Sequence, residues 1–166
     1  MTIYLVIPLL AVICLLQATV VPRLVIWGIF PDLPLLVVGN WSLLRGSREG
    51  LVWGFVAGLM VDLFSGAPFG AATASLMAVG FLAGFGEASV FRNPFLPPVA
   101  IFLATVVYDL LFLLVVQVSG NTVEWLPSLF RVIAPSALLN ALLTPLVLGV
   151  MRMLYSHLKR DEVGLG

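Results

Sequence analysis

Three polar side chains stand out because each interrupts a long apolar run. Asp62 lies near the end of one run, just before the turn sequence SGAPFG at residues 65–70, whereas Asp109 and Asn140 lie in the middle of two later runs. A carboxylate among apolar residues carries a large free-energy cost, so it usually has a structural partner or a functional role. For Asp62, the structural interpretation is that its side chain caps the turn that follows.

Asp109 and Asn140 are predicted to lie at similar depth on two antiparallel helices that follow one another in the chain. Each lies roughly 13–15 Å from the same end of its run, at 1.5 Å per helical residue. Thr105 and Thr144 lie four residues away on the same helix faces, so the spacing predicts a polar ladder between the two helices. Three interpretations stay open for this ladder: a hydrogen-bonded clamp, the lining of a cavity that receives a partner, and a proton or ion relay.

Catalytic and metal-binding patterns are absent from the sequence. It contains no glycine-rich phosphate loop, no GxSxG, no HExxH and no CxxC motif, and Cys14 and His157 are its only cysteine and histidine. Ser65 therefore has no histidine base for nucleophilic catalysis. We expect no enzyme activity, no metal and no cofactor, and the formal net charge of zero argues against nucleic acid as a partner.

The composition indicates a membrane protein. Hydrophobic residues make up 61% and charged residues 10% of the chain, against about 45–50% and about 25% in soluble domains. Six apolar runs are suited to membrane helices: residues 3–21, 24–44, 51–64, 69–86, 97–118 and 132–154. We therefore predict an all-α protein with six transmembrane helices over residues 1–155 and a short tail over residues 156–166. Pro31 and Pro34 interrupt the second run, so a kinked span and a re-entrant loop before a short helix both fit it.

The basic residues predict how the six runs are oriented. With the N-terminus inside, the inner connections hold Arg45, Arg48, Arg92, Arg152, Lys159 and Arg160, and the outer ones hold only Arg23 and Arg131. This asymmetry follows the positive-inside rule, so we expect both termini in the cytoplasm. The outer segment of residues 120–131 mixes polar and apolar residues, and we expect it to lie along the outer surface of the membrane.

Two similar pentapeptides, GFVAG and GFLAG, occur in the third and fourth runs. They place Gly54, Gly58, Gly80 and Gly84 at a spacing of four residues within each run. Glycine at this spacing opens one helix face to close approach by another helix. We expect either tight packing between these two helices or contact with the membrane helix of a partner.

A proline, a basic turn and an acidic turn motif combine in residues 31–84. A short apolar run follows Pro31, Arg45 and Arg48 form the basic turn, and the pattern GFxxGLxxDxxSGxPxG occupies residues 54–70. This combination strongly resembles the MreD family of bacterial rod-shape-determining membrane proteins. The sequence FRN at residues 91–93 and the acid Asp109 also look like family features, and the length, six spans and basic tail extend the resemblance to nearly the whole chain.

The resemblance implies a noncatalytic role in peptidoglycan synthesis and rod-shaped growth, in the cytoplasmic membrane of a bacterium. It implies MreC as the main protein partner within the lipid membrane. The cytoskeletal protein MreB and a RodA/penicillin-binding-protein pair would be contacted directly or through MreC. The oligomeric state stays open, a homo-oligomer included.

The family fold is similar to the six-helix substrate-binding subunits of energy-coupling-factor vitamin transporters. That similarity implies an outward-opening pocket, which we expect to bind a helical segment of MreC, and Asp62 and the turn would then shape its mouth. The candidate pocket residues are Asp62, Ser65, Gly66, Pro68, Gly70, Asp109 and Asn140. The alternative function is that of a vitamin transporter's substrate-binding subunit, which would need several polar side chains to hold its ligand.

Overall fold

The computed structural model describes residues 2–23, 29–89 and 92–163, and helices form most of this part of the chain. In chain order the elements are α1 (Thr2–Thr19), the 3-10 turn η1 (Val21–Arg23), α2 (Leu33–Arg45), α3 (Ser47–Phe64), α4 (Ala71–Ala83), the 3-10 segment η2 (Gly84–Ser89), α5 (Leu96–Val118), α6 (Trp125–Ser128), the π-helical turn η3 (Leu129–Ile133) and α7 (Ala134–Val163). Residues 24–28 of the second predicted run and Phe91 of the 91–93 pattern lie outside the described residues.

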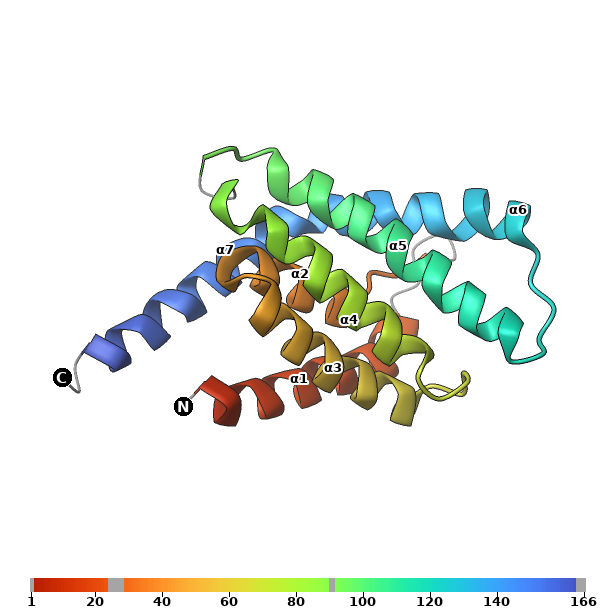
Figure 1. Cartoon of the computed structure of the whole chain (residues 1–166), viewed down its shortest axis with the longest axis horizontal. Coiled ribbons are helices and arrows are strands. Elements are labelled where there is room, and N and C mark those ends of the chain that lie inside the picture. The colour runs from red at the N-terminus through yellow and green to blue at the C-terminus, as the bar shows by residue number, and fades with distance from the viewer. Residues whose placement is uncertain (1, 24–28, 90–91, 164–166) are drawn as a thin grey trace.

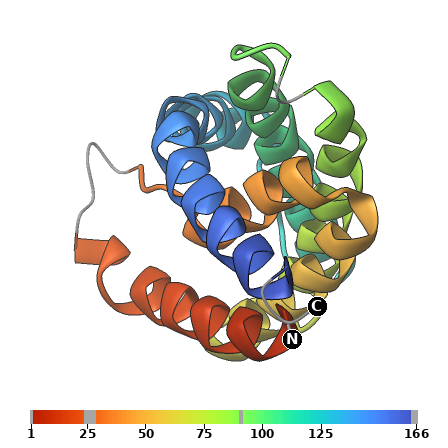
Figure 2. The ribbon, with the colours of Figure 1, turned by 90° about the vertical axis from the view of Figure 1, so that its left-hand side faces the viewer.

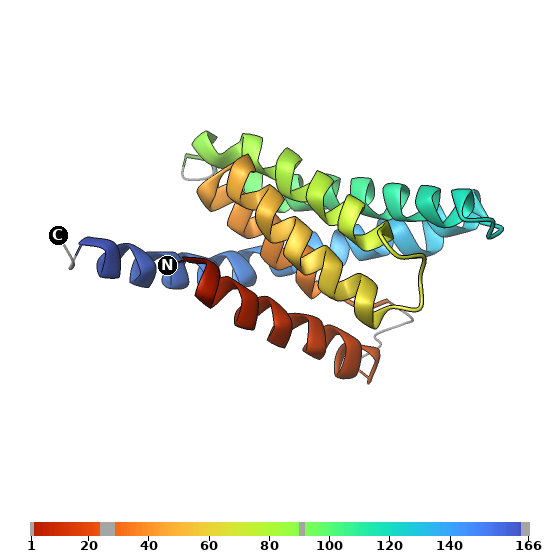
Figure 3. The ribbon, with the colours of Figure 1, turned by 60° about the horizontal axis from the view of Figure 1, so that its bottom comes forward.

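The helices run back and forth along one long axis, so alternate connections gather at opposite ends of the bundle (Figure 1). One end carries both termini, the α2–α3 turn and η2, and we call it the terminal end (Figures 1 and 3). The opposite end carries η1, the loop of residues 65–70 and the α5–α6 connection, and we call it the distal end. This alternation of connections is the one that six consecutive crossings require.

The helices differ in their capacity to cross a membrane alone. In the described chain, two continuous stretches are long and apolar enough to do so, Leu96–Val118 and Trp125–His157. The 23 residues of α5 measure about 35 Å, more than the roughly 30 Å hydrocarbon layer. α1 and α3 have 18 residues each, about 27 Å, and α4 is extended by η2.

α2 is a short helix at the centre of the bundle. Figure 2, viewed from the terminal end, shows it surrounded by α1, α3, α4, α5 and α7, and it contacts each of them. Every residue from Pro34 to Leu44 is buried, as expected for a helix that is apolar on all faces. Its 13 residues measure only about 20 Å. The described part of the second run is therefore a short helix that starts inside the bundle.

Local sequence sets both ends of α2. Asp32 is its N-cap, with a carboxylate oxygen 3.0 Å from the backbone nitrogen of Leu35, and Pro34 lies in the first turn, where no intrahelical donor is lost. The helix stops at Gly46, whose φ of +87° is readily adopted only by glycine. The interruption that the two prolines predicted is thus the start of a capped helix.

The expectation for residues 120–131 was wrong in part. From Trp125 onward the chain is helical, and α6, η3 and α7 form one continuous helical path rather than a segment lying along the membrane surface. The indole Nε1 of Trp125 donates to Gln117 at 2.8 Å, which ties the start of this path to the end of α5. Leu126, Leu129 and Phe130 continue the apolar exposed surface of α7, so the mixed composition belongs to a helix end. At its other end α7 continues through the predicted tail as far as Val163.

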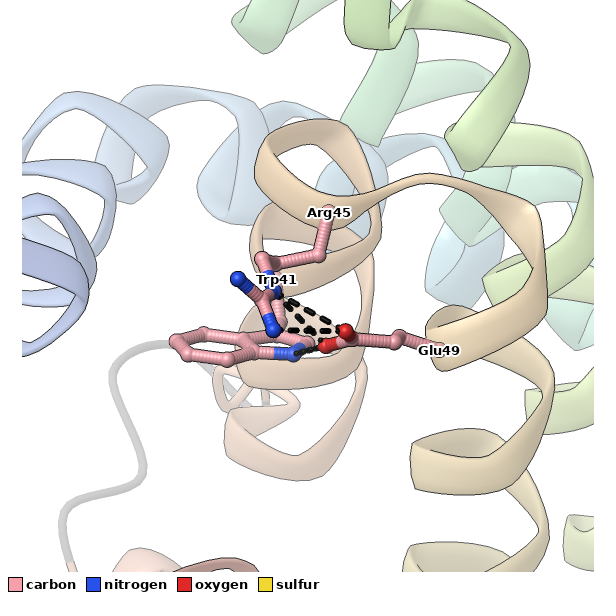
Figure 4. Close-up of polar contacts among 3 residues, drawn as sticks. All are labelled: Trp41, Arg45 and Glu49. Carbon is pink, nitrogen blue, oxygen red and sulfur yellow. Dashed lines mark hydrogen bonds and ion pairs between the residues drawn. The ribbon is translucent and has the colours of Figure 1, made fainter. Parts of the chain in front are cut away.

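An ionic and aromatic cluster joins three helices at the terminal end. Arg45 at the end of α2 forms a salt bridge of 2.7 Å with Glu49 on α3, and Trp41 donates its indole N–H to the same carboxylate at 3.1 Å (Figure 4). The Arg45 guanidinium also lies 5.5 Å from the ring centre of Tyr155 on α7, while Trp41 stacks on Trp53. The hydrogen bonds to Glu49 raise the pKa of Arg45 above its usual value. The cluster fixes α2 and α3 against α7.

Candidate functional site

Asp62 caps the N-terminus of α4 from the neighbouring helix. Its carboxylate accepts hydrogen bonds from the backbone nitrogens of Gly70, Ala72 and Thr73 at 2.9–3.0 Å, and from the Thr73 hydroxyl at 2.6 Å. These backbone groups are among the first N–H groups of a helix, which have no partner within it, and the helix dipole favours a negative charge there. The side chain is only 4% exposed. Its position therefore fixes the loop of residues 65–70 between α3 and α4.

Gly70 makes this cap geometrically feasible. It precedes the first residue of α4 with φ of +99°, in the left-handed region where a side chain is strained. That conformation lets its own N–H and those of Ala72 and Thr73 face one carboxylate. The acid and the last glycine of the turn motif thus act together, at a distance of eight residues.

Side chains from two distant helices satisfy the broken backbone before α2. The backbone N–H of Asp32 donates to Asn140 Oδ1 on α7 at 3.1 Å, and that of Leu33 donates to Gln17 Oε1 on α1 at 3.0 Å. Non-helical backbone inside a membrane persists only where protein or water satisfies its polar groups. Asn140, which is fully buried, and Gln17 therefore explain how a helix starts at this depth.

The predicted ladder between α5 and α7 is present in part. Asn140 Nδ2 donates to the Thr105 hydroxyl at 3.3 Å, and the Thr144 hydroxyl donates to the carbonyl of Asn140 at 2.8 Å. No hydrogen bond joins Asp109 to Asn140 in the described chain, and the Oδ2 atom of Asp109 is buried without a hydrogen-bond partner there. Asn140 is turned toward the start of α2 instead, because the unpaired N–H of Asp32 lies there.

One buried tyrosine shares a region of the bundle with three carboxylates. Tyr108, which is 8% exposed, interacts electrostatically with Asp32, Asp62 and Asp109. Asp32 and Asp109 also interact with each other. The structure therefore brings the two predicted acids, Asp62 and Asp109, into one region with Asp32, although Asp32 and Asp62 are occupied as helix caps.

The four predicted glycines lie in a seam between α3 and α4. A Cβ added at Gly54 or Gly58 would overlap the backbone of α4 at Leu76 and Thr73, whereas one added at Gly80 or Gly84 would overlap α3. The partners in the second case are Gly50 and Ser47. Ser42 on α2 donates to the carbonyl of Gly80 in the same place. The two pentapeptides thus do not face each other; each faces the backbone of the other helix one or two turns away.

A groove lies between α1 and α3 toward the distal end, and we call it the distal groove. Cys14, Gln17 and Ala18 line it from α1, and Val61, Phe64 and Ser65 line it from α3. It encloses about 220 Å³. The hydroxyl oxygen of Ser65 is buried and has no hydrogen-bond partner among the described residues, which is unusual for a buried polar atom.

The predicted pocket residues do not all lie in one place. Ser65 lines the distal groove, and Gly66 and Gly70 lie in the adjoining loop with no atom within 4 Å of an added Cβ. Asp109 and Asn140 lie on α5 and α7, away from the lining of this groove. Pro68 accepts a hydrogen bond from Ala71 through its carbonyl and so belongs to the turn.

Sequence reasoning missed Asp32 and Gln17. Asp32 could have been found, because an aspartate two residues before a proline is a typical helix N-terminus. Gln17 is the one side-chain amide in the first run, but its partner is 16 residues away, beyond a stretch that includes undescribed chain. In the described ranges, no group of three or more histidine, cysteine, aspartate or glutamate side chains has a geometry that could hold a metal ion.

Comparison with known proteins gives one result. The family model of the rod shape-determining protein MreD matches residues 1–157. No curated protein and no solved structure matches the chain. Because the family model covers nearly the whole chain, including both capped helix starts and the α3–α4 seam, this chain belongs to the MreD family of rod shape-determining proteins.

Proposed function

We propose that this chain is a noncatalytic membrane scaffold of the bacterial cell-elongation complex and that it binds a helical segment of MreC in the distal groove. Family membership supports a role in determining rod shape. In this proposal the chain connects MreC, directly or indirectly, with MreB and with a RodA/penicillin-binding-protein pair that synthesises peptidoglycan. Both termini lie in the cytoplasm, so the distal end faces outward.

The observation that carries MreC binding is the unpaired hydroxyl of Ser65 in an apolar groove. A buried polar atom without a partner costs about 1–3 kcal/mol, and a segment whose docking opens the groove enough to reach this hydroxyl would remove that cost. Val61, Phe64 and Ala18 give the rest of the lining an apolar character suited to one face of a helix. Asp62 and Gly70 hold the adjoining loop in place and so preform the rim.

The size of the distal groove supports a protein segment over a vitamin. Small-molecule pockets typically enclose about 300–1,000 Å³ and bury most of the ligand, whereas this groove encloses about 220 Å³. Apart from the Ser65 hydroxyl, the polar side chains nearby are occupied, since Asp62 caps α4 and Gln17 accepts from Leu33. A few side chains of a helix fit this space better than a whole vitamin. An overall fold like that of the vitamin-binding subunits remains part of the proposal.

The test is recovery of MreC from membranes with variants that block the groove. Ala18→Trp places a large ring in the groove, and Gly66→Trp places one at its rim, where an added side chain meets no other atom. Overpacking costs about 1–3 kcal/mol and 1.4 kcal/mol is tenfold in affinity, so we expect MreC recovery to fall by about tenfold. Val118→Trp is the matched control, because Val118 is 80% exposed at the distal end of α5.

Two outcomes would contradict the proposal. One is MreC recovery with Ala18→Trp and Gly66→Trp equal to that with Val118→Trp, at equal membrane levels. The other is a small molecule that copurifies in stoichiometric amount and is displaced by Ala18→Trp, which would assign the groove to a ligand.

A further inference from the structure

A second groove lies at the terminal end, between the start of α5 and the middle of α7, and we call it the terminal groove. Pro97 and Pro98 line it from α5, Pro145 and Gly149 line it from α7, and Arg152 lies at the same site. A Cβ added at Gly149 would meet no atom within 4 Å. The absence of a side chain at that position therefore helps to keep the groove open.

The flanks of the terminal groove are apolar and exposed. Val150 and Met153, beside Gly149 and Arg152 on α7, are 56% and 69% exposed. In a membrane protein such residues face lipid chains, so the terminal groove opens toward lipid. Pro97 and Pro98 lie in the first turn of α5, so the terminal groove reaches the level at which we expect lipid head groups.

The volume of the terminal groove limits its occupant. It encloses about 190 Å³, which at about 30 Å³ per water molecule in the liquid corresponds to roughly six water-sized groups. That suits a phosphate with the first atoms of a glycerol, and it is below the roughly 300 Å³ at which drug-sized ligands bind.

The charge of the site selects an anion. Arg152 is exposed, and a guanidinium binds phosphate oxygens through paired N–H groups. Arg92 lies two residues before Pro94, another residue of the groove lining. Pro97 and Pro98 have no backbone N–H, so the first turn of α5 offers few hydrogen-bond donors to an anion. Arg152 therefore supplies the attraction for the anion.

We propose that the terminal groove binds the phosphate head group of an anionic glycerophospholipid, with Arg152 as its main contact and an acyl chain along the apolar flanks. Basic pockets between membrane helices on the cytoplasmic side are typical sites for such head groups. The site lies at the end of the bundle opposite the distal groove, so it is independent of MreC binding.

The experiment is native mass spectrometry of the purified full chain titrated with phosphatidylglycerol or with phosphatidylcholine of the same acyl chains. We expect one phosphatidylglycerol to bind more tightly than any phosphatidylcholine. Arg152→Gln should weaken that binding by about fivefold, since a basic residue near the surface contributes about 1 kcal/mol. Gly149→Leu keeps the charge but fills the groove, and it should weaken binding of the same lipid by at least as much.

Arg48→Gln is the matched control, because Arg48 is an exposed arginine on α3 at the same end and does not line the groove. Equal losses for Arg152→Gln and Arg48→Gln would show diffuse attraction by surface charge and overturn the site. Full binding by Gly149→Leu would overturn the groove as its location. Displacement of the lipid by millimolar inorganic phosphate would assign the site to a free anion instead.

Discussion

The carboxylate of Asp62 provides the sharpest test of how this fold is held together. It accepts three backbone hydrogen bonds and one hydroxyl hydrogen bond at the start of α4, and it is almost fully buried. Asp62→Ala would leave three N–H groups without a partner. At about 1–1.5 kcal/mol for each net hydrogen bond, the expected loss in the free energy of unfolding is about 3–4 kcal/mol. Replacing an ordinary N-cap residue costs about 0.5–2 kcal/mol, so Asp62→Ala should lower the free energy of unfolding more than the loss of an ordinary cap does.

Thermal unfolding in detergent, followed by the fluorescence of the buried Trp41 and Trp53, measures this loss. For a chain of this size about 1 kcal/mol shifts the midpoint by about 2–4 °C, so Asp62→Ala should unfold about 6–16 °C earlier. Thr73→Val removes only the hydroxyl bond and should cost about 1 kcal/mol. Hydrogen exchange at residues 70–73 should speed up in Asp62→Ala, because those amides lose their acceptor.

The reasoning would be refuted by an Asp62→Ala protein that unfolds within 2 °C of the unmodified chain and keeps slow exchange at residues 70–73. Asp62 would then not act as a cap. If the same variant also lost MreC, the carboxylate would have to be assigned to partner binding. If Asp62→Ala both unfolds early as expected and loses MreC, displacement of the rim of the distal groove explains the loss of MreC.

Two further variants test the buried contacts that hold the broken span and the helix seam. Asn140→Leu removes the acceptor for the Asp32 N–H and should lower the free energy of unfolding by about 1–3 kcal/mol. Asn121→Leu, in the exposed α5–α6 connection, is the control and should leave the free energy of unfolding unchanged. Equal unfolding midpoints for the two variants would contradict the role of Asn140. Gly80→Ala drives a Cβ into the backbone of Gly50 and should lower the unfolding midpoint, because packed helices must move apart at a cost of about 1–3 kcal/mol. Gly149→Ala, at an open position on α7, is the control and should raise the unfolding midpoint slightly, because alanine favours a helix more than glycine does. A Gly80→Ala protein as stable as the Gly149→Ala protein would show that the seam is loosely packed.

The helix pattern and several local features could be predicted from the sequence. Apolar runs and basic connections predict the number of helices and their alternation, because each depends on residues close together in the chain. Capping by Asp62 was one of the two interpretations that the sequence allowed for this acid. It was predictable because the acid and its partners lie within eleven residues of each other. The family was also identifiable from the motif at residues 54–70.

The partners of the buried polar residues could not be predicted from spacing alone. Asn140 has the right depth for Asp109, yet it bonds to the backbone of Asp32, which is 108 residues away in the chain. The choice depends on where α2 begins inside the bundle, and that follows from the packing of five surrounding helices. The register of the α3–α4 seam is similar: the glycines predict close approach, but only the packed structure pairs Gly80 with Gly50.

The polar atoms inside this bundle have a common physical cause. α2 begins inside the bundle and the first residues of α4 are buried, so the N–H groups of their first turns need acceptors from the protein. Asp32, Asp62 and Asn140 supply the acceptors instead. Side chains committed in this way have little capacity left for a ligand or a proton path. In the described chain, buried polar atoms without a partner are few, and the hydroxyl of Ser65 is one of them.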